Sequence, residues 1–272
     1  AIQLEFEGFE TFKFQLNGRL PRGVFSKDLI LHLIGDVTAD GATYMAAEYT
    51  GEAITDLSVE ARFTISNMAI EMGAKCGLME ADEKTLAWVK QHSRKGFEPV
   101  SADADAVYSR VKEYDVSRLE PQVAKPHTVD NVAPVSEVAG TPIQQGVIGT
   151  CTNGRIEDLR IAAAILQGKK VKRGTRLVVA PASRQILLQA MREGLIEILV
   201  ESGAAMVTPG CGPCVGTHNG VPSDGENVIS TANRNFKGRM GNNRAFVYLA
   251  SPATVAASVI NGEITDPRKY ID

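Results

Sequence analysis

Strand-like and helix-like segments alternate along almost the whole chain of 272 residues. In the first half we predict strands at 11–16, 43–49 and 76–79, and helices at 26–34, 58–74 and 82–92. In the second half we predict strands at 146–149, 176–180, 204–207 and 245–249, and helices at 156–166, 185–192, 195–201 and from 252 onward. Such alternation is typical of parallel sheets covered by helices, so we predict an α/β fold.

A proline-containing stretch separates the two halves of this pattern. Pro121, Pro126, Pro134 and Pro142 lie in a region with little hydrophobic periodicity, which is typical of an extended connection. We therefore predict an α/β domain over residues 1–116, an extended connection over 117–145 and a second α/β domain over 146–272.

Charge and cysteine content narrow the classes of partner and compartment. The formal net charge of −3 provides no basic face for nucleic acid and no attraction to anionic membranes, so we expect neither partner. The chain also lacks an apolar run near the roughly 18 residues of a spanning helix. Four cysteines in a chain of this length favour metal binding or catalysis in a reducing, cytoplasmic setting. Because the chain opens at Ala1 without a methionine, we expect it to be a fragment.

Three cysteines stand beside glycines where strands are predicted to end. Cys211 and Cys214 share a loop rich in glycine and proline, and Cys151 follows an apolar run just before a helical pattern. A C-x-x-C pair alone fits a zinc site, a redox pair or coincidence. A structural zinc needs a fourth ligand, for which Cys76 and His218 are the nearby candidates, and a redox pair normally opens a helix. Three cysteines at strand ends better suit an iron–sulfur cluster with one open iron. We interpret Cys76, inside an apolar strand, as core packing.

Several polar residues have two readings when only their spacing is considered. Asn67 and Glu71 lie one helical turn apart, and spacing alone favours a solvated stripe. Arg234 and Arg239 read as surface charges, although arginine also suits bidentate binding of carboxylates. Arg155 either contacts a substrate or begins a helix.

Several motifs in order resemble the aconitase superfamily. They cover residues 149–155, 210–216 and 233–239, with further similarity at 40–44, 60–71 and 120–123. Within the superfamily, the chain is most similar to the branch of 3-isopropylmalate dehydratase and homoaconitase large subunits, and the similarity covers nearly the whole chain.

The resemblance implies a fold, a cofactor and a set of site residues. The fold would be aconitase-like, with three-layer α/β/α domains equivalent to the second and third domains of the family. One [4Fe–4S] cluster would be held by Cys151, Cys211 and Cys214. Asn67 and Glu71 would be catalytic residues near the cluster. The substrate-binding residues implied are Asn233, Arg234, Arg239 and Arg155.

The resemblance also implies a reaction and partners. The reaction would interconvert 2-isopropylmalate and 3-isopropylmalate by dehydration and rehydration, with homocitrate as the alternative substrate and a cluster-free scaffold as the alternative from another class. A small dicarboxylate or tricarboxylate would be bound. A small subunit with a swivelling domain would supply the base, and an N-terminal domain of the same subunit would complete the site. We therefore expect this chain to be inactive alone and to self-associate through apolar surface.

Overall fold

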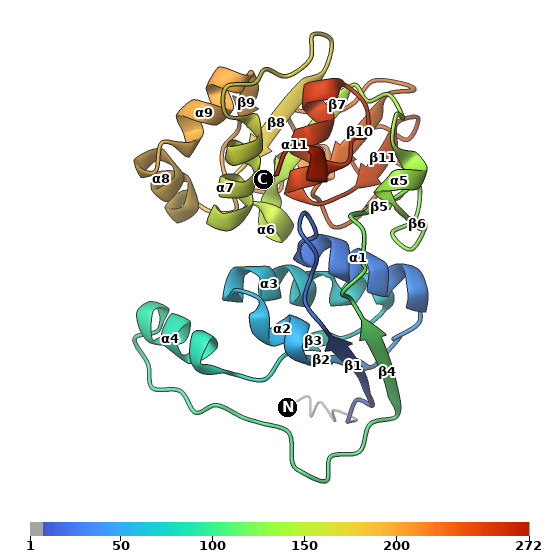
Figure 1. Cartoon of the computed structure of the whole chain (residues 1–272), viewed down its shortest axis with the longest axis vertical. Coiled ribbons are helices and arrows are strands. Elements are labelled where there is room, and N and C mark those ends of the chain that lie inside the picture. The colour runs from blue at the N-terminus through green and yellow to red at the C-terminus, as the bar shows by residue number, and fades with distance from the viewer. Residues whose placement is uncertain (1–7, 272) are drawn as a thin grey trace, which may run out of the picture.

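The computed structural model describes residues 8–271 and contains two sheets, one in each half of the chain (Figure 1). The first has the order β3-β2-β1-β4 and is parallel throughout. Its strands are β1 (Thr11–Asn17), β2 (Ala46–Thr50), β3 (Cys76–Leu78) and β4 (Arg110–Asp115). The second sheet has the order β6-β5-β11-β10-β7-β8-β9. Its strands are β5 (Gln122–Ala124), β6 (Val132–Pro134), β7 (Gln145–Gly149), β8 (Arg176–Ala180), β9 (Ala204–Met206), β10 (Asn227–Ser230) and β11 (Phe246–Leu249).

Helices connect most of these strands, as the sequence predicts for an α/β fold. In the first half they are α1 (Ser26–Val37), α2 (Glu52–Asp56), α3 (Val59–Met68), the 3-10 turn η1 (Ala69–Met72) and α4 (Glu83–His92). In the second half they are α5 (Val135–Val138), α6 (Thr150–Asn153), α7 (Ile156–Leu166), α8 (Arg184–Arg192), α9 (Leu195–Ser202), α10 (Gly212–Val215), α11 (Pro252–Asn261) and η2 (Pro267–Lys269). Within residues 8–271, no helix has the length and apolar character needed to cross a membrane. The α/β class is confirmed.

The first sheet is covered by helices on the face that looks toward the second sheet. Along β1 the buried side chains are Phe12, Phe14 and Leu16, and they share one core with α1 and α3. These two helices lie between the sheets (Figure 1), and α1 also contacts β5 and β6. Because α1 has neighbours on both sides, it is buried around most of its circumference.

The second sheet is buried on both faces, as its continuous apolar strands require. Ile148 and Val179 belong to a core shared with α7, α9 and α11, whereas Val147 and Val178 belong to the core that contains α1. Neighbouring residues along a strand point to opposite faces, so the two cores lie on opposite sides. The second sheet thus forms the middle layer of an α/β/α arrangement.

Several elements differ from the sequence-based prediction. The helix expected to stop at Gly35 continues to Val37, and a Cβ atom at Gly35 would lie 2.8 Å from Val132, so this glycine serves close packing. The helix expected over 58–74 ends at Met68 and continues as a 3-10 turn to Met72. Core packing was the wrong interpretation for Cys76, which lies exposed on the edge strand β3.

Four strands were not predicted from the sequence, namely β4, β5, β6 and β10. Two of them, β5 and β6, lie within the proposed connection over 117–145 and join the edge of the second sheet as antiparallel strands. These are three-residue strands, too short for a hydrophobic period to be recognised. The division into two domains at 117–145 stays a prediction.

Candidate functional site

The two cysteine loops follow parallel strands of the second sheet. Cys151 lies in α6 directly after β7, and Cys211 precedes α10, which contains Cys214 and follows β9 along the chain. Strands β7, β8 and β9 are neighbours and run parallel, so both loops leave the sheet at the carboxyl ends of its strands. Carboxyl ends of parallel strands are the usual place for a ligand site in α/β proteins.

A constrained turn carries the chain from β7 into Cys151. Gly149 has a φ of +133°, and a Cβ atom there would lie 1.9 Å from the carbonyl oxygen of Ala180 in β8. Thr150 follows with a φ of +69°, a left-handed conformation that is unfavourable for a β-branched residue. Strained backbone conformations of this kind are typical of functional sites, where they orient a neighbouring side chain. Here the neighbouring residue is Cys151.

Helix α3 holds the Cys151 turn from the side of the first sheet. The Thr64 hydroxyl donates to the carbonyl oxygen of Thr152 at 3.1 Å, and the Thr152 hydroxyl donates to Asn67 Oδ1 at 3.0 Å. The amide nitrogen Nδ2 of Asn67 in turn lies 3.7 Å from Cys151 Sγ. Asn67 therefore meets the first cysteine, as an amide N–H that can stabilise an anionic sulfur.

Glu71, a predicted catalytic residue, contacts two of the predicted substrate-binding residues. Its Oε1 accepts hydrogen bonds from Asn233 Nδ2 at 3.0 Å and from Arg234 Nε at 2.8 Å. The side chain of Glu71 is nearly buried. Burial raises the pKa of this carboxyl, and the hydrogen bond from Arg234 opposes that rise. Within residues 8–271 its second oxygen, Oε2, makes no hydrogen bond, so it is left available to accept or donate a proton.

Cys214 lies on the far side of Asn233 from Glu71. Its thiol is buried and lies 3.9 Å from Asn233 Oδ1, while Arg239 Nη2 donates toward the sulfur at 3.4 Å. The Nε of Arg239 is buried and has no hydrogen-bond partner among the described residues. Asn233 thus connects the glutamate to a cysteine, and Arg239 brings a positive charge to that sulfur.

The structure brings some of the predicted residues together more closely than others. Arg155 begins α7, and its guanidinium donates to the carbonyl oxygen of Thr152 at 2.6 Å while stacking over Phe63. Its contacts are those of a residue that shapes the Cys151 turn, and a substrate contact stays a prediction. Cys211 is exposed beside Gly212, where a Cβ atom would lie 2.4 Å from the ring of His218.

The three cysteines have the side-chain chemistry that an iron–sulfur cluster requires of its ligands. All four cysteines of the chain are free, and two of the three candidates have an N–H donor near the sulfur, which is typical of cluster thiolates. Among residues 8–271, however, no three Cys, His, Asp or Glu side chains gather closely enough to hold a metal ion. The predicted close approach of all three sulfurs is therefore not confirmed at single-ion spacing. A cubane binds each thiolate at a different iron, so it requires sulfurs spaced more widely than one ion does.

A cavity of about 330 Å³ opens beside the glutamate. It is lined by Glu71 and Arg234 together with His127, Val129 and Phe236. The cavity thus offers one carboxyl group and one guanidinium to a ligand within a partly apolar wall, which suits a small carboxylic acid.

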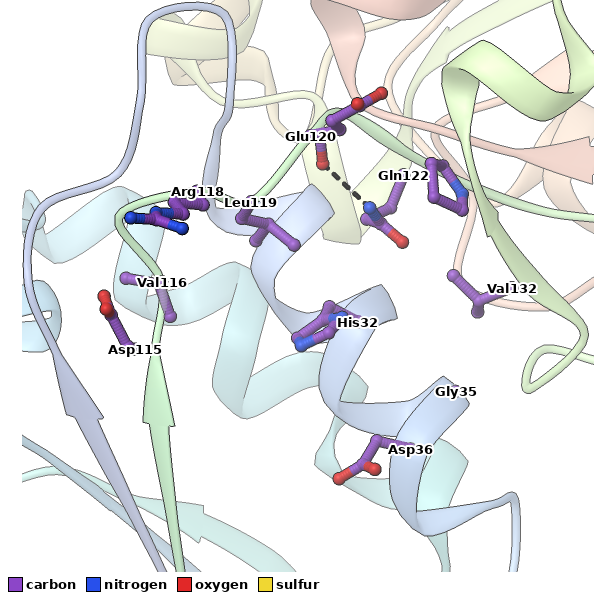
Figure 2. Close-up of a pocket in the computed structure, with 11 residues that line it drawn as sticks. His32, Gly35, Asp36, Asp115, Val116, Arg118, Leu119, Glu120, Gln122 and Val132 are labelled. Carbon is purple, nitrogen blue, oxygen red and sulfur yellow. Dashed lines mark hydrogen bonds between the residues drawn. The ribbon is translucent and has the colours of Figure 1, made fainter.

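A second cleft, of about 570 Å³, lies along α1 and the end of β4 (Figure 2). Its lining includes His32, Asp36 and Arg118, and it contains none of the predicted site residues. Asp36 is already engaged by the Tyr114 hydroxyl at 2.6 Å and by Lys112. Because this cleft contains none of the predicted site residues, we assign the chemistry to the Glu71 cavity.

One further residue, which was not predicted from the sequence, reaches the same region. Lys27 of α1 is fully buried, and its Nζ donates to the carbonyl oxygens of Thr231 and Ala232, just before Asn233. The available signal was a lysine in the first turn of an otherwise apolar helix. Without the tertiary contacts, such a lysine is expected to point to solvent at the start of the helix.

Comparison with known proteins agrees with these features. The model of the aconitase family (aconitate hydratase) matches residues 2–142 and 133–262. The 3-isopropylmalate dehydratase large subunit 2 of Archaeoglobus fulgidus is 57% identical over 263 residues, which are 96% of this chain and 63% of that protein. The probable methanogen homoaconitase large subunit of Methanosarcina mazei is 54% identical over 267 residues, 98% of this chain and 68% of that protein. The chain thus spans less than two thirds of the Archaeoglobus relative. From the family match over most of its length, we conclude that the chain belongs to the aconitase family.

Proposed function

We propose that this chain is the cluster-binding part of the large subunit of a cytoplasmic hydro-lyase that interconverts 2-isopropylmalate and 3-isopropylmalate. The observation that carries the proposal is the contact between Glu71, Asn233 and Arg234 beside Cys214. The names of relatives that are 50–57% identical support the choice of substrate. The words "large subunit" in these names support a small subunit as the partner.

In this proposal Cys151, Cys211 and Cys214 would hold a [4Fe–4S] cluster, which would supply Lewis-acid chemistry toward a carbon–oxygen bond of the substrate. Arg234 contacts Glu71 through Nε, so its two terminal nitrogens are left to bind a substrate carboxylate in bidentate fashion. Arg239 adds a second cation beside Cys214. Two fixed guanidinium groups suit an acid with two carboxylates.

The proposed role of Glu71 is to hold and move a proton at Oε2. Its Oε1 is fixed by Asn233 and Arg234, which orients the carboxyl group, and burial raises its pKa toward the range useful for proton transfer. Asn67 holds the Cys151 turn through Thr152 and the cysteine sulfur. The base that removes the substrate proton on carbon would come from the small subunit.

The proposal is tested by assaying the complete large subunit with its small subunit after anaerobic reconstitution. We expect turnover of 2-isopropylmalate, and we expect Glu71→Gln to lower kcat by about a hundredfold with little change in KM. Glutamine keeps an oxygen that accepts from Asn233 and Arg234 but cannot carry the proton. Glu137→Gln, at an exposed position on α5, is the control. Wild-type kinetics in Glu71→Gln would remove this residue from the site.

Homocitrate is the second candidate substrate, because the Methanosarcina relative is named a probable homoaconitase and is nearly as similar. The same assay with homocitrate separates the two readings by the ratio of kcat/KM values. Absence of turnover with either acid, together with absence of a cluster after reconstitution, would instead favour a cluster-free scaffold.

A further inference from the structure

Helix α1 places a lysine side chain in the protein interior. Lys27 is 0% exposed, and its Nζ donates to the carbonyl oxygens of Thr231 at 2.9 Å and Ala232 at 2.7 Å. Burying an ammonium group is unfavourable unless hydrogen bonds compensate for the lost water. A methionine would fill a similar volume without that cost, so packing alone does not explain a lysine at this position.

The two carbonyl groups belong to the turn that leads into the site. Thr231 and Ala232 follow β10 directly, and the next two residues, Asn233 and Arg234, donate to Glu71. The Thr231 hydroxyl also accepts from the backbone nitrogen of Gly149 at 2.8 Å. One turn therefore connects α1, the end of β7 before Cys151, and the two residues that contact the glutamate.

The charge of Lys27 is surrounded by acidic groups. Burial lowers the pKa of Lys27 to about 7, while Cys214, Asp158, Glu71 and Asp28 raise it. Two of these neighbours, Cys214 and Glu71, belong to the candidate site. The ammonium group of Lys27 therefore lies near two groups, Cys214 and Glu71, that can carry negative charge in the proposed site.

We infer that Lys27 is a positioning residue: its ammonium group fixes the turn formed by Thr231 and Ala232, so that Asn233 and Arg234 meet Glu71. The inference concerns the geometry of the turn and rests on the proposed function only where substrate binding is used as a readout. Lys27 itself contacts backbone carbonyls and not the reacting groups.

Amide hydrogen exchange of the complete large subunit, measured before cluster reconstitution, tests the geometric part. In Lys27→Met we expect exchange at residues 231–235 to accelerate about tenfold, because the carbonyl oxygens of Thr231 and Ala232 lose the hydrogen bonds from Nζ. Lys27→Gln keeps a shorter, uncharged donor, and we expect about a threefold acceleration. Lys84→Met is the matched control, since Lys84 also donates to backbone carbonyls, of Thr55 and Asp56, but at an exposed position on α4.

Kinetics of the reconstituted enzyme with its small subunit test whether the position of the turn affects substrate binding. We expect KM for the carboxylate substrate to rise about tenfold in Lys27→Met and about threefold in Lys27→Gln, with kcat lowered less and Lys84→Met unchanged. Exchange at 231–235 and KM values that match those of the control in both Lys27 variants would overturn the inference. If Lys27→Met does not fold, as judged by circular dichroism, Lys27→Gln against Lys84→Met decides. A wild-type enzyme without turnover would contradict the proposed function, while the exchange data would still decide the role of Lys27.

Discussion

Arg234 has two proposed roles, and different nitrogens of its guanidinium group serve them: one contacts Glu71 and the others bind a substrate carboxylate. Its Nε is bound to Glu71, and a lysine at this position would have no equivalent of the planar group that serves both the glutamate and a substrate carboxylate. We expect Arg234→Lys to raise KM about tenfold and to change kcat less. The control is Arg244→Lys, because Arg244 is exposed and, among the described residues, forms a salt bridge with Asp224 alone. Equal KM values in the two variants would remove Arg234 from substrate binding.

A buried carboxyl beside the Cys151 turn predicts a pH dependence of stability. Asp158 accepts from Asn153 Nδ2 at 2.9 Å and from the backbone nitrogen of Arg155 at 3.0 Å, and burial raises its pKa from 3.8 to about 7. Between these two pH values the native state holds a proton that the unfolded state has released. Each unit rise in pH then lowers the free energy of unfolding by up to about 1.4 kcal/mol, and the loss is complete above pH 7.

Asp158→Asn removes the titrating group and keeps one side-chain oxygen as an acceptor. We therefore expect the free energy of unfolding of the variant to fall less steeply between pH 4 and pH 7 than that of the wild type. Urea denaturation at several pH values measures the difference. Parallel curves for the two proteins would show that Asp158 titrates alike in the folded and unfolded states.

Motif similarity predicted Asn67, Glu71, Asn233 and Arg234 as site residues, because their spacing alone did not distinguish them from surface residues. The structure shows that Glu71 contacts Asn233 and Arg234, and that Asn67 contacts the Cys151 turn; their roles in the site stay predictions. Lys27 was missed because its partners are main-chain carbonyls more than two hundred positions away, which no local pattern reveals.

At the scale of secondary structure, helix α3 connects the two halves of the site. Its N-cap, Ser58, accepts from the backbone nitrogen of Ala61 at 3.0 Å and donates to Glu157 in the first turn of α7 at 2.5 Å. The same helix carries Asn67, which contacts the Cys151 turn. The cap therefore stabilises both the start of α3 and its contact with the second half of the chain.

Ser58→Ala should lower the free energy of unfolding by about 1–2 kcal/mol, since it removes an N-cap and a hydrogen bond to Glu157. Ser183→Ala, at the cap of α8, removes one bond to Ile186 and should cost about 1 kcal/mol. Chemical denaturation of both variants measures the two losses. A smaller loss at Ser58 than at Ser183 would contradict a stabilising contact between α3 and α7.

Elements with a clear apolar pattern were predicted whatever their length, whereas strands β4, β5, β6 and β10 were not. The helix over 156–166 and the strand over 176–180 were predicted with the bounds that the structure has. Strand β10 has four residues and lies in the centre of the second sheet, where pairing with β7 and β11 stabilises it. Its strand conformation depends on those neighbours more than on its own sequence.

For the whole molecule, the two sheets meet at a core that includes α1, and the candidate site lies along this meeting of the two halves. Glu71 and Asn67 come from the first half, while Asn233, Arg234, Cys151 and Cys214 come from the second. Groups from segments far apart in sequence therefore depend on one interface. The expected self-association through apolar surface stays a prediction.

We propose that Cys151, Cys211 and Cys214 bind one cluster and that Cys76 does not. Iron and acid-labile sulfide should be measured in the complete large subunit after anaerobic reconstitution, for the wild type and for each of the four cysteine-to-serine variants. We expect about four irons per chain in the wild type and in Cys76→Ser, and a large loss in each of the other three variants. Full iron content in any of those three variants, or a comparable loss in Cys76→Ser, would contradict this assignment of the cluster ligands.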